Sequence, residues 1–141
     1  MSILMGLADL RAFLAQEFPQ VSDEFVIEHL DDDVLRMRLR VADRHLRPGG
    51  TVSGPTMFAL ADVSVYLAIL SRIGPVGLAV TTNCSIDFMR KPRSGVDLLA
   101  STRLLKLGRV LAVGDVLIRS EGEEQPVARA SMTYSIPKDA R

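Results

Sequence analysis

The sequence predicts an α+β domain in which a long apolar helix lies against an antiparallel β-sheet. Apolar residues recur at helical spacing near the amino terminus and again between Pro55 and Ile73. Segments with a period of two indicate two strands before the long helix and four after it. No alternating strand–helix–strand repeat indicates a parallel sheet, so the strands are expected to pair antiparallel.

The first element is a helix that ends before Pro19. Asp9, Arg11 and Glu17 interrupt its apolar pattern, and it lacks the positively charged flank of a signal peptide. We therefore expect an amphipathic helix. Its apolar positions are Ile3, Leu7, Leu10, Phe13, Leu14 and Phe18.

Two strands of a hairpin are expected next, at residues 24–30 and 34–41, around an acidic turn at residues 31–33. In the second strand three arginines alternate with apolar residues, which indicates one face in water. The alternation consists of Leu35, Met37, Leu39 and Val41 against Arg36, Arg38 and Arg40.

The loop RPGGTVSGP leads into the long helix, with Ser53 or Gly54 as N-cap and Pro55 at the first helical position. Gly74 and Pro75 end it, giving a rod of about 28 Å. Its apolar stretch is expected to be too short for a membrane span and contains Asp62. A helix apolar on all sides must be covered, so we expect a homo-oligomer.

Four strands are predicted after the helix, the first of them at residues 78–88. Its alternation places Leu78, Val80, Thr82, Cys84, Ile86 and Phe88 on one face and Ala79, Thr81, Asn83, Ser85 and Asp87 on the other. The remaining three strands are expected at about residues 96–107, 109–119 and 127–136.

Length and composition indicate one domain spanning residues 1–141, with 48% hydrophobic residues. Seventeen basic residues balance seventeen acidic ones, which argues against nucleic-acid or anionic-membrane partners. Cys84 is the single cysteine, so no internal disulfide forms, and no spacing typical of a zinc site is present. We expect a cytoplasmic protein without a bound metal.

Asp62 is the only charged residue between Pro48 and Ser71, and an unpaired buried carboxylate is costly. It either caps a loop or pairs with an arginine of another strand, or it lines a cleft as nucleophile or general base. Near it, Gly54 opens the long helix, where a backbone N–H can stabilise an oxyanion. The alternative for Gly54 is a purely structural helix start.

The other reactive residue types have simpler structural interpretations. His29 and His45 are expected in polar strand and loop positions, and Cys84 in packing. Ser64 and Tyr66 are expected to be packing residues of the helix. Two basic groups are either solvated strand ends or jointly a site for the phosphates of a nucleotide-bearing ligand. They consist of Arg90, Lys91 and Arg93, and of Lys106 and Arg109.

The segment SGPTMFALADVSVYLAI, with the later CSIDFMRKP and LLKLGR, resembles the PaaI-like acyl-CoA thioesterases of the hotdog-fold superfamily. The resemblance runs from about Asp43 to the last strand. It implies a hotdog fold, in which a curved sheet of about six strands wraps the long helix. It makes Gly54 the oxyanion donor and Asp62 the nucleophile or base, and Thr81 matches the position that orients the attacking water.

The resemblance also implies a site shared between two subunits, with the Gly from one and the acid from the other, and dimers that pair into tetramers. CoA enters as part of the substrate, with no separate cofactor. Met57, Phe58 and Tyr66 suggest a medium-chain or aromatic acyl group. The positions matching those that hold CoA phosphates are Arg90, Lys91, Lys106 and Arg109.

Three positions depart from the family pattern: Arg47 replaces an Asn, Ser53 replaces a His, and Pro55 replaces the second Gly. Arg47 can still donate to a carbonyl or a substrate carboxylate, and Ser53 can cap the helix. These departures leave a non-catalytic acyl-CoA binder as an alternative. A third possible function is that of a dehydratase or hydratase, because His45 lies nine residues before Gly54. The position at which a dehydratase would carry its catalytic acid is, however, Ala59.

Overall fold

The computed structural model describes residues 2–138. Two α-helices and six strands follow one another in the predicted order, so the predicted α+β class and hotdog arrangement are confirmed. The elements are α1 (Leu7–Glu17), β1 (Phe25–Leu30), β2 (Leu35–Leu39), the 3-10 turn η1 (Asp43–His45), α2 (Gly54–Ile73), β3 (Val80–Phe88), β4 (Leu98–Leu107), β5 (Leu111–Ser120) and β6 (Pro126–Ser135).

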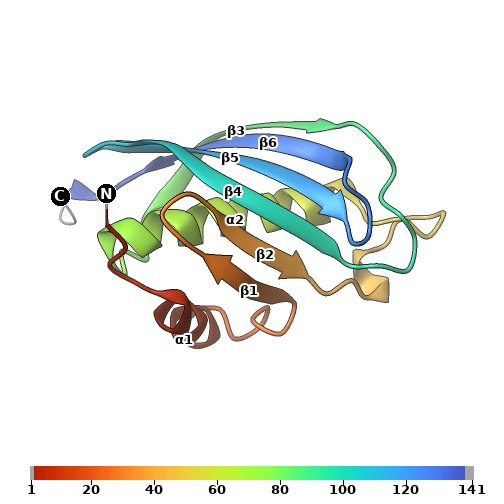
Figure 1. Ribbon diagram of the computed structural model, residues 1–141, viewed down its shortest axis with the longest axis horizontal. Coiled ribbons are helices and arrows are strands. Elements are labelled where there is room, and N and C mark those ends of the chain that lie inside the picture. The colour runs from red at the N-terminus through yellow and green to blue at the C-terminus, as the bar shows by residue number, and fades with distance from the viewer. Residues whose placement is uncertain (1, 139–141) are drawn as a thin grey trace.

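The six strands form one antiparallel sheet in the order β1-β2-β4-β5-β6-β3. The sheet curves over α2, and α1 lies beside β1 at one edge (Figure 1). β3 is the opposite edge strand. The side chains that α2 and the sheet bury between them form the core, so α2 is fixed relative to every strand that carries a candidate site residue.

The long helix α2 begins where the sequence predicted, because Ser53 is its N-cap and accepts a hydrogen bond from the Thr56 amide at 3.3 Å. Gly74 caps the other end, and its N–H donates to the Leu70 carbonyl at 2.9 Å. With 20 residues, α2 is long and apolar enough to cross a membrane by length and composition alone, but 61% of its apolar window is buried inside the protein. Its burial against the sheet accounts for its composition.

Gly114 on β5 allows α2 to approach the sheet closely. A Cβ added at this glycine would lie 2.8 Å from Val65 Cγ1, closer than real carbon atoms approach. A larger residue would therefore require the Val65 side chain or the helix that carries it to shift. The absence of a side chain at Gly114 thus lets α2 pack closely on β5.

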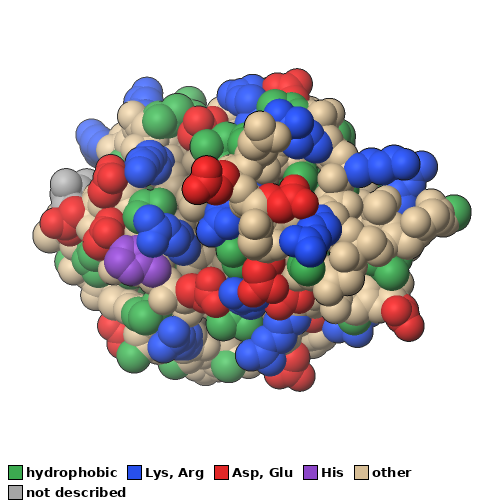
Figure 2. All heavy atoms as spheres, turned by 45° about the vertical axis from the view of Figure 1, so that its right-hand side comes forward, with side chains coloured by type: hydrophobic (Ala, Val, Ile, Leu, Met, Phe, Trp, Pro, Cys, Tyr) green, Lys and Arg blue, Asp and Glu red, His purple; other side chains and the backbone are tan. Residues whose placement is uncertain are grey.

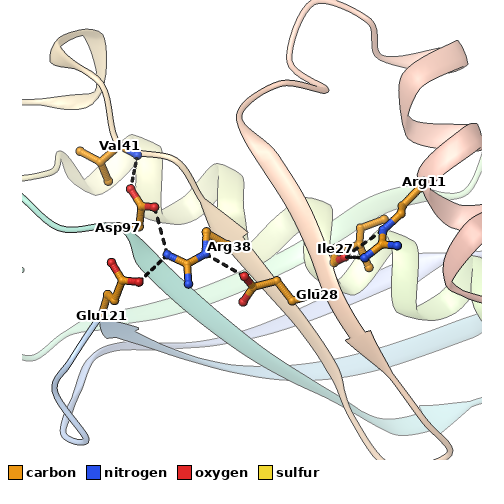
Figure 3. Close-up of polar contacts among 7 residues, drawn as sticks. All are labelled: Arg11, Ile27, Glu28, Arg38, Val41, Asp97 and Glu121. Atoms are coloured by element: carbon orange, nitrogen blue, oxygen red, sulfur yellow. Dashed lines mark hydrogen bonds and ion pairs between the residues drawn. The ribbon is translucent and has the colours of Figure 1, made fainter.

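Arg38, predicted on the wet face of β2, joins three separate segments (Figure 3). It donates to Glu28 on β1 at 2.8 Å, to Asp97 at 3.0 Å and to Glu121 at 2.7 Å. Arg11 connects α1 to β1 by donating to the Ile27 carbonyl at 2.8 Å. Acidic and basic side chains lie next to one another over the face in Figure 2.

Candidate active site

Asp62 lies in the middle of α2 and is half-buried, with two hydroxyl groups directed at the same carboxylate oxygen. Thr81 Oγ1 donates to Asp62 Oδ1 at 2.6 Å, and the Tyr134 hydroxyl donates to it at 2.7 Å. Among residues 2–138 none donates to Oδ2. The carboxylate is thus held through one oxygen, and the other is available to a substrate or water.

A β-bulge in β3 brings Thr81 to this position. Thr81 pairs with Tyr134 and Asn83 with Thr133, so Thr82 is the extra residue. The sequence analysis placed Thr81 on the face opposite Cys84, and this was wrong, because it assumed an uninterrupted period of two. The bulge shifts the alternation by one residue, and Thr81 faces α2 together with Cys84 and Ile86.

The pocket beside Asp62 has a volume of about 410 Å³, and three of its nine lining residues are aromatic. The Tyr66 ring lies 5.9 Å from that of Phe18, just after α1, edge to face, and 6.0 Å from that of Tyr134. The Tyr66 hydroxyl donates to the Gly77 carbonyl at 3.0 Å. Asp62 is the one carboxylate among the residues that line this pocket.

The neighbouring titratable groups stay neutral near pH 7. Burial raises the pKa of Tyr134 far above its ordinary value, and Asp62 adds to this effect. Burial likewise raises the pKa of Tyr66 and, with a further contribution from Asp62, that of Cys84. These two phenols and the thiol therefore add no charge of their own near this pocket.

A second pocket, of about 380 Å³, lies at the start of α2 and is cationic. Gly54 is the first helical residue, so its N–H has no acceptor within the helix. A Cβ at this glycine would lie 3.2 Å from the Phe88 ring, so its absence lets the ring cover the helix start. Arg47, Arg90 and Lys91 line the same pocket.

Within one chain, Gly54 and Asp62 do not meet. They are eight residues apart on one helix, which corresponds to about 12 Å along its axis. The four basic residues expected to hold CoA phosphates are also divided between the two ends of the sheet. The strand register places Lys106 and Arg109 at the end that carries Thr81, whereas Arg90 and Lys91 follow Phe88 at the other end.

Further expectations are corrected by the structure. Met57 lines the Gly54 pocket and Tyr66 the Asp62 pocket, while Phe58 is 37% exposed, so these three residues do not line one pocket. His45 is buried rather than in a polar loop. Its Nδ1 accepts from the Ala42 amide at 2.8 Å, and its Nε2 lies 3.3 Å from Glu24, so both ring nitrogens face protein groups.

Comparison with known proteins identifies the family. The profile of the thioesterase superfamily matches residues 49–127. This range includes β3 and the helix α2, along which both pockets lie. The chain belongs to the thioesterase superfamily. A proposed esterase of Pseudomonas aeruginosa is 33% identical over 103 residues, covering 73% of this chain and 75% of that protein. A proposed esterase of Deinococcus radiodurans is 34% identical over 95 residues, which cover 67% of this chain and 62% of that protein.

Solved structures agree with this thioesterase-superfamily membership. A proposed thioesterase of a Silicibacter species is 61% identical, with a TM-score of 0.91, covering 97% of this chain and 95% of that one. A mutant of the phenylacetic acid degradation protein PaaI from Thermus thermophilus is 28% identical, with a TM-score of 0.72. The match covers 84% of this chain and 99% of that one. The PaaI-like resemblance read from the sequence is thereby confirmed.

Tyr134 is the functional candidate that the sequence analysis missed in this thioesterase-superfamily chain. No functional role was assigned to it within the predicted strand at residues 127–136. A buried tyrosine nevertheless requires a partner for its hydroxyl. That requirement was the available signal, but the partner, Asp62, lies 72 residues away in the sequence.

Proposed function

We propose that this protein hydrolyses acyl-CoA thioesters to a free acid and CoA, with Asp62 as nucleophile or general base. The observation that carries the proposal is the Asp62 carboxylate at the wall of a pocket that contains three aromatic residues. Two hydroxyls hold one of its oxygens, and no donor to the other oxygen is found among residues 2–138. Membership of the thioesterase superfamily supports this class of reaction.

The chemistry balances with the groups present. As a base, Asp62 takes a proton from water as the water oxygen bonds to the thioester carbon, and the C–S bond then breaks to release the CoA thiol. As a nucleophile, an Asp62 oxygen bonds to the thioester carbon and the C–S bond breaks to release the CoA thiolate. Water then hydrolyses the resulting anhydride to the free acid and the regenerated carboxylate. In either case the Gly54 N–H of a second subunit stabilises the oxyanion.

The arrangement of β3 supports a site shared between two chains. β3 is an edge strand, and Val80 and Phe88 at its two ends are 55% and 52% exposed. Antiparallel pairing of two β3 strands around a twofold axis places the Thr81 end of one against the Arg90 end of the other. Asp62 of one chain then faces the cationic Gly54 pocket of its partner, and such dimers are proposed to pair into tetramers.

The substrate is proposed to carry a medium-chain or aromatic acyl group, which the Phe18, Tyr66 and Tyr134 rings would contact. In a dimer, the two chains would bring the four basic residues from both ends of the sheet to one site, where they would hold the CoA phosphates. Arg47 would donate to a carbonyl or to a substrate carboxylate. The four basic residues are Arg90, Lys91, Lys106 and Arg109. Ser53 caps the helix that presents Gly54. No separate cofactor is required, and the cytoplasm, where acyl-CoA is available, is the proposed location.

Thiol release from short, medium, long and aromatic acyl-CoAs, measured on the native protein and on Asp62→Asn, tests the proposal. The Asn side chain keeps an oxygen for Thr81 and Tyr134, so the fold should remain while turnover is lost. Turnover retained by Asp62→Asn would exclude the assignment of Asp62. If the native protein binds acyl-CoA without hydrolysing any, the Arg47 and Ser53 departures favour the alternative of a non-catalytic binder.

A further inference from the structure

Tyr134 has contacts that a packing residue does not need. It is 3% exposed, and its hydroxyl lies 2.7 Å from Asp62 Oδ1 and 3.0 Å from the Asp62 carbonyl oxygen. Its ring is held against that of Tyr66, and β6 pairs it directly with Thr81. The hydroxyl is therefore placed by the sheet and the aromatic cluster, independently of any ligand.

A tyrosine hydroxyl carries one proton, and both acceptors within its reach, Oδ1 at 2.7 Å and the carbonyl oxygen at 3.0 Å, belong to Asp62. Because Tyr134 remains protonated at physiological pH, it acts as a hydrogen-bond donor to the carboxylate. Thr81 supplies the second donor to the same oxygen. The Thr81 oxygen can still accept a hydrogen bond from water while its proton is donated to Asp62.

We infer that Tyr134 is a positioning residue that, with Thr81, holds the Asp62 carboxylate through Oδ1 and thereby assigns Oδ2 as the oxygen that reacts. This inference rests on the proposed thioester hydrolysis. Rotation about the last side-chain bond of an aspartate exchanges its two oxygens, and two donors on Oδ1 oppose that rotation. A carboxylate aligned before the substrate arrives spends more of its time in the reactive geometry.

The chain offers a matched control, because Tyr66 is its only other tyrosine. Tyr66 is comparably buried at 7% exposure and lines the same pocket, but its hydroxyl donates to the Gly77 carbonyl. Tyr134→Phe and Tyr66→Phe each remove one buried phenol hydroxyl. Only the first removes a donor from Asp62.

The test compares kcat, KM and the pH profile of kcat/KM for the native protein, Tyr134→Phe, Tyr66→Phe and Asp62→Asn. For Tyr134→Phe we expect kcat to fall by about 10- to 100-fold while KM changes little. Because a hydrogen bond to a carboxylate favours its ionised form, losing the donor should move the acidic limb to higher pH. Cys84, Tyr66 and Tyr134, which face Asp62, have raised pKa values and do not titrate on that limb.

Each result separates the two proposals. Tyr66→Phe should keep the native pH profile whatever its KM. A native kcat and pH profile in Tyr134→Phe, with Asp62→Asn inactive, would overturn the positioning role and leave thioester hydrolysis standing. Absence of hydrolysis by the native protein would overturn both. If Tyr134→Phe unfolds, Thr81→Val and Thr81→Ser are measured in its place. Thr81→Val should lower kcat and shift the acidic limb of the pH profile, whereas Thr81→Ser should keep the native kcat and the native limb. Equal behaviour of these two variants would contradict the inference.

Discussion

The two pockets along α2 differ in charge, lining and relation to the helix. The pocket at its start combines the free Gly54 N–H with Arg47, Arg90 and Lys91, whereas the pocket eight residues later has one carboxylate among aromatic rings. One suits the phosphates and developing oxyanion of a thioester, and the other suits its acyl group and the attacking oxygen. A single chain keeps the two functions apart, so the comparison predicts that two chains complete each site.

Among changes to the cationic pocket, removal of the Gly54 N–H should cause the largest loss of activity. Ser53 has φ −74° and ψ 156°, a conformation compatible with a following proline, and proline is tolerated in the first helical turn. The added Cβ would lie 3.2 Å from the Phe88 ring, so this ring has to shift by a few tenths of an ångström. We expect Gly54→Pro to fold with that adjustment and to lose about 10²- to 10³-fold in kcat, the usual cost of removing one oxyanion donor. Steady-state kinetics and the melting temperature would check this, and a native kcat in a folded variant would remove Gly54 from the mechanism.

Charging the β3 edge should separate the two pockets without altering either one. Asn83 and Ser85 are both outside the buried core in the single chain, so replacing both by Glu should preserve its fold. In a β3-paired dimer the four added charges would repel one another. We expect the variant to be monomeric by analytical ultracentrifugation. At the same protein concentration, its activity should be lower than that of the native protein by at least about 10-fold.

The control for the charged edge is Arg36→Glu. This substitution changes the charge of each chain by the same two units at an exposed position on β2, which lies four strands from β3 in the sheet order. It should remain a dimer with native activity. A fully active monomer of the Asn83 and Ser85 variant would show that the two pockets do not need one another.

Removing cations from the Gly54 pocket should affect binding more than chemistry. For Arg90→Ala with Lys91→Ala we expect KM for acyl-CoA to rise by about 10-fold, kcat to stay near native and the salt dependence of KM to weaken. Arg36→Ala, an exposed arginine on β2, is the control and should change neither. An unchanged KM in the double variant would move the CoA phosphates elsewhere.

The smallest effect is expected at the aromatic wall. Phe18→Ala enlarges the Asp62 pocket by removing the ring that packs edge to face on Tyr66. We expect the ratio of kcat/KM for a longer over a shorter acyl chain to rise by about 10-fold, since one or two methylenes are worth that much in an apolar pocket. A ratio that stays constant across the panel would place the acyl group outside this pocket.

Much of the fold could be predicted because its signals are local. Ser53, Pro55 and Gly74 fix the ends of α2 through capping and backbone preference, and periodicity identifies the strands. The β-bulge at Thr82 could not be predicted, because no glycine marks it and its cause lies in the pairing with β6. That one residue determines which face Thr81 takes.

The candidate site was predicted in part for the same reason. Asp62 was identified because a lone carboxylate in an apolar helix is conspicuous in any sequence. Its partner Tyr134 requires knowing that β3 and β6 are neighbours, which is a property of sheet order rather than of local pattern. The separation of Arg90 from Lys106 likewise follows from strand register, which composition does not contain.

Mixing two inactive variants tests the shared site most directly. Asp62→Asn keeps the cationic pocket, and Gly54→Pro keeps the carboxylate. In a mixed dimer, one site receives both defects and the other receives neither. If each site combines Asp62 of one chain with Gly54 of its partner, unfolding and refolding an equal mixture should recover about one quarter of native thiol release. No recovery, with mixed dimers demonstrated by mass spectrometry, would contradict a site built from two chains.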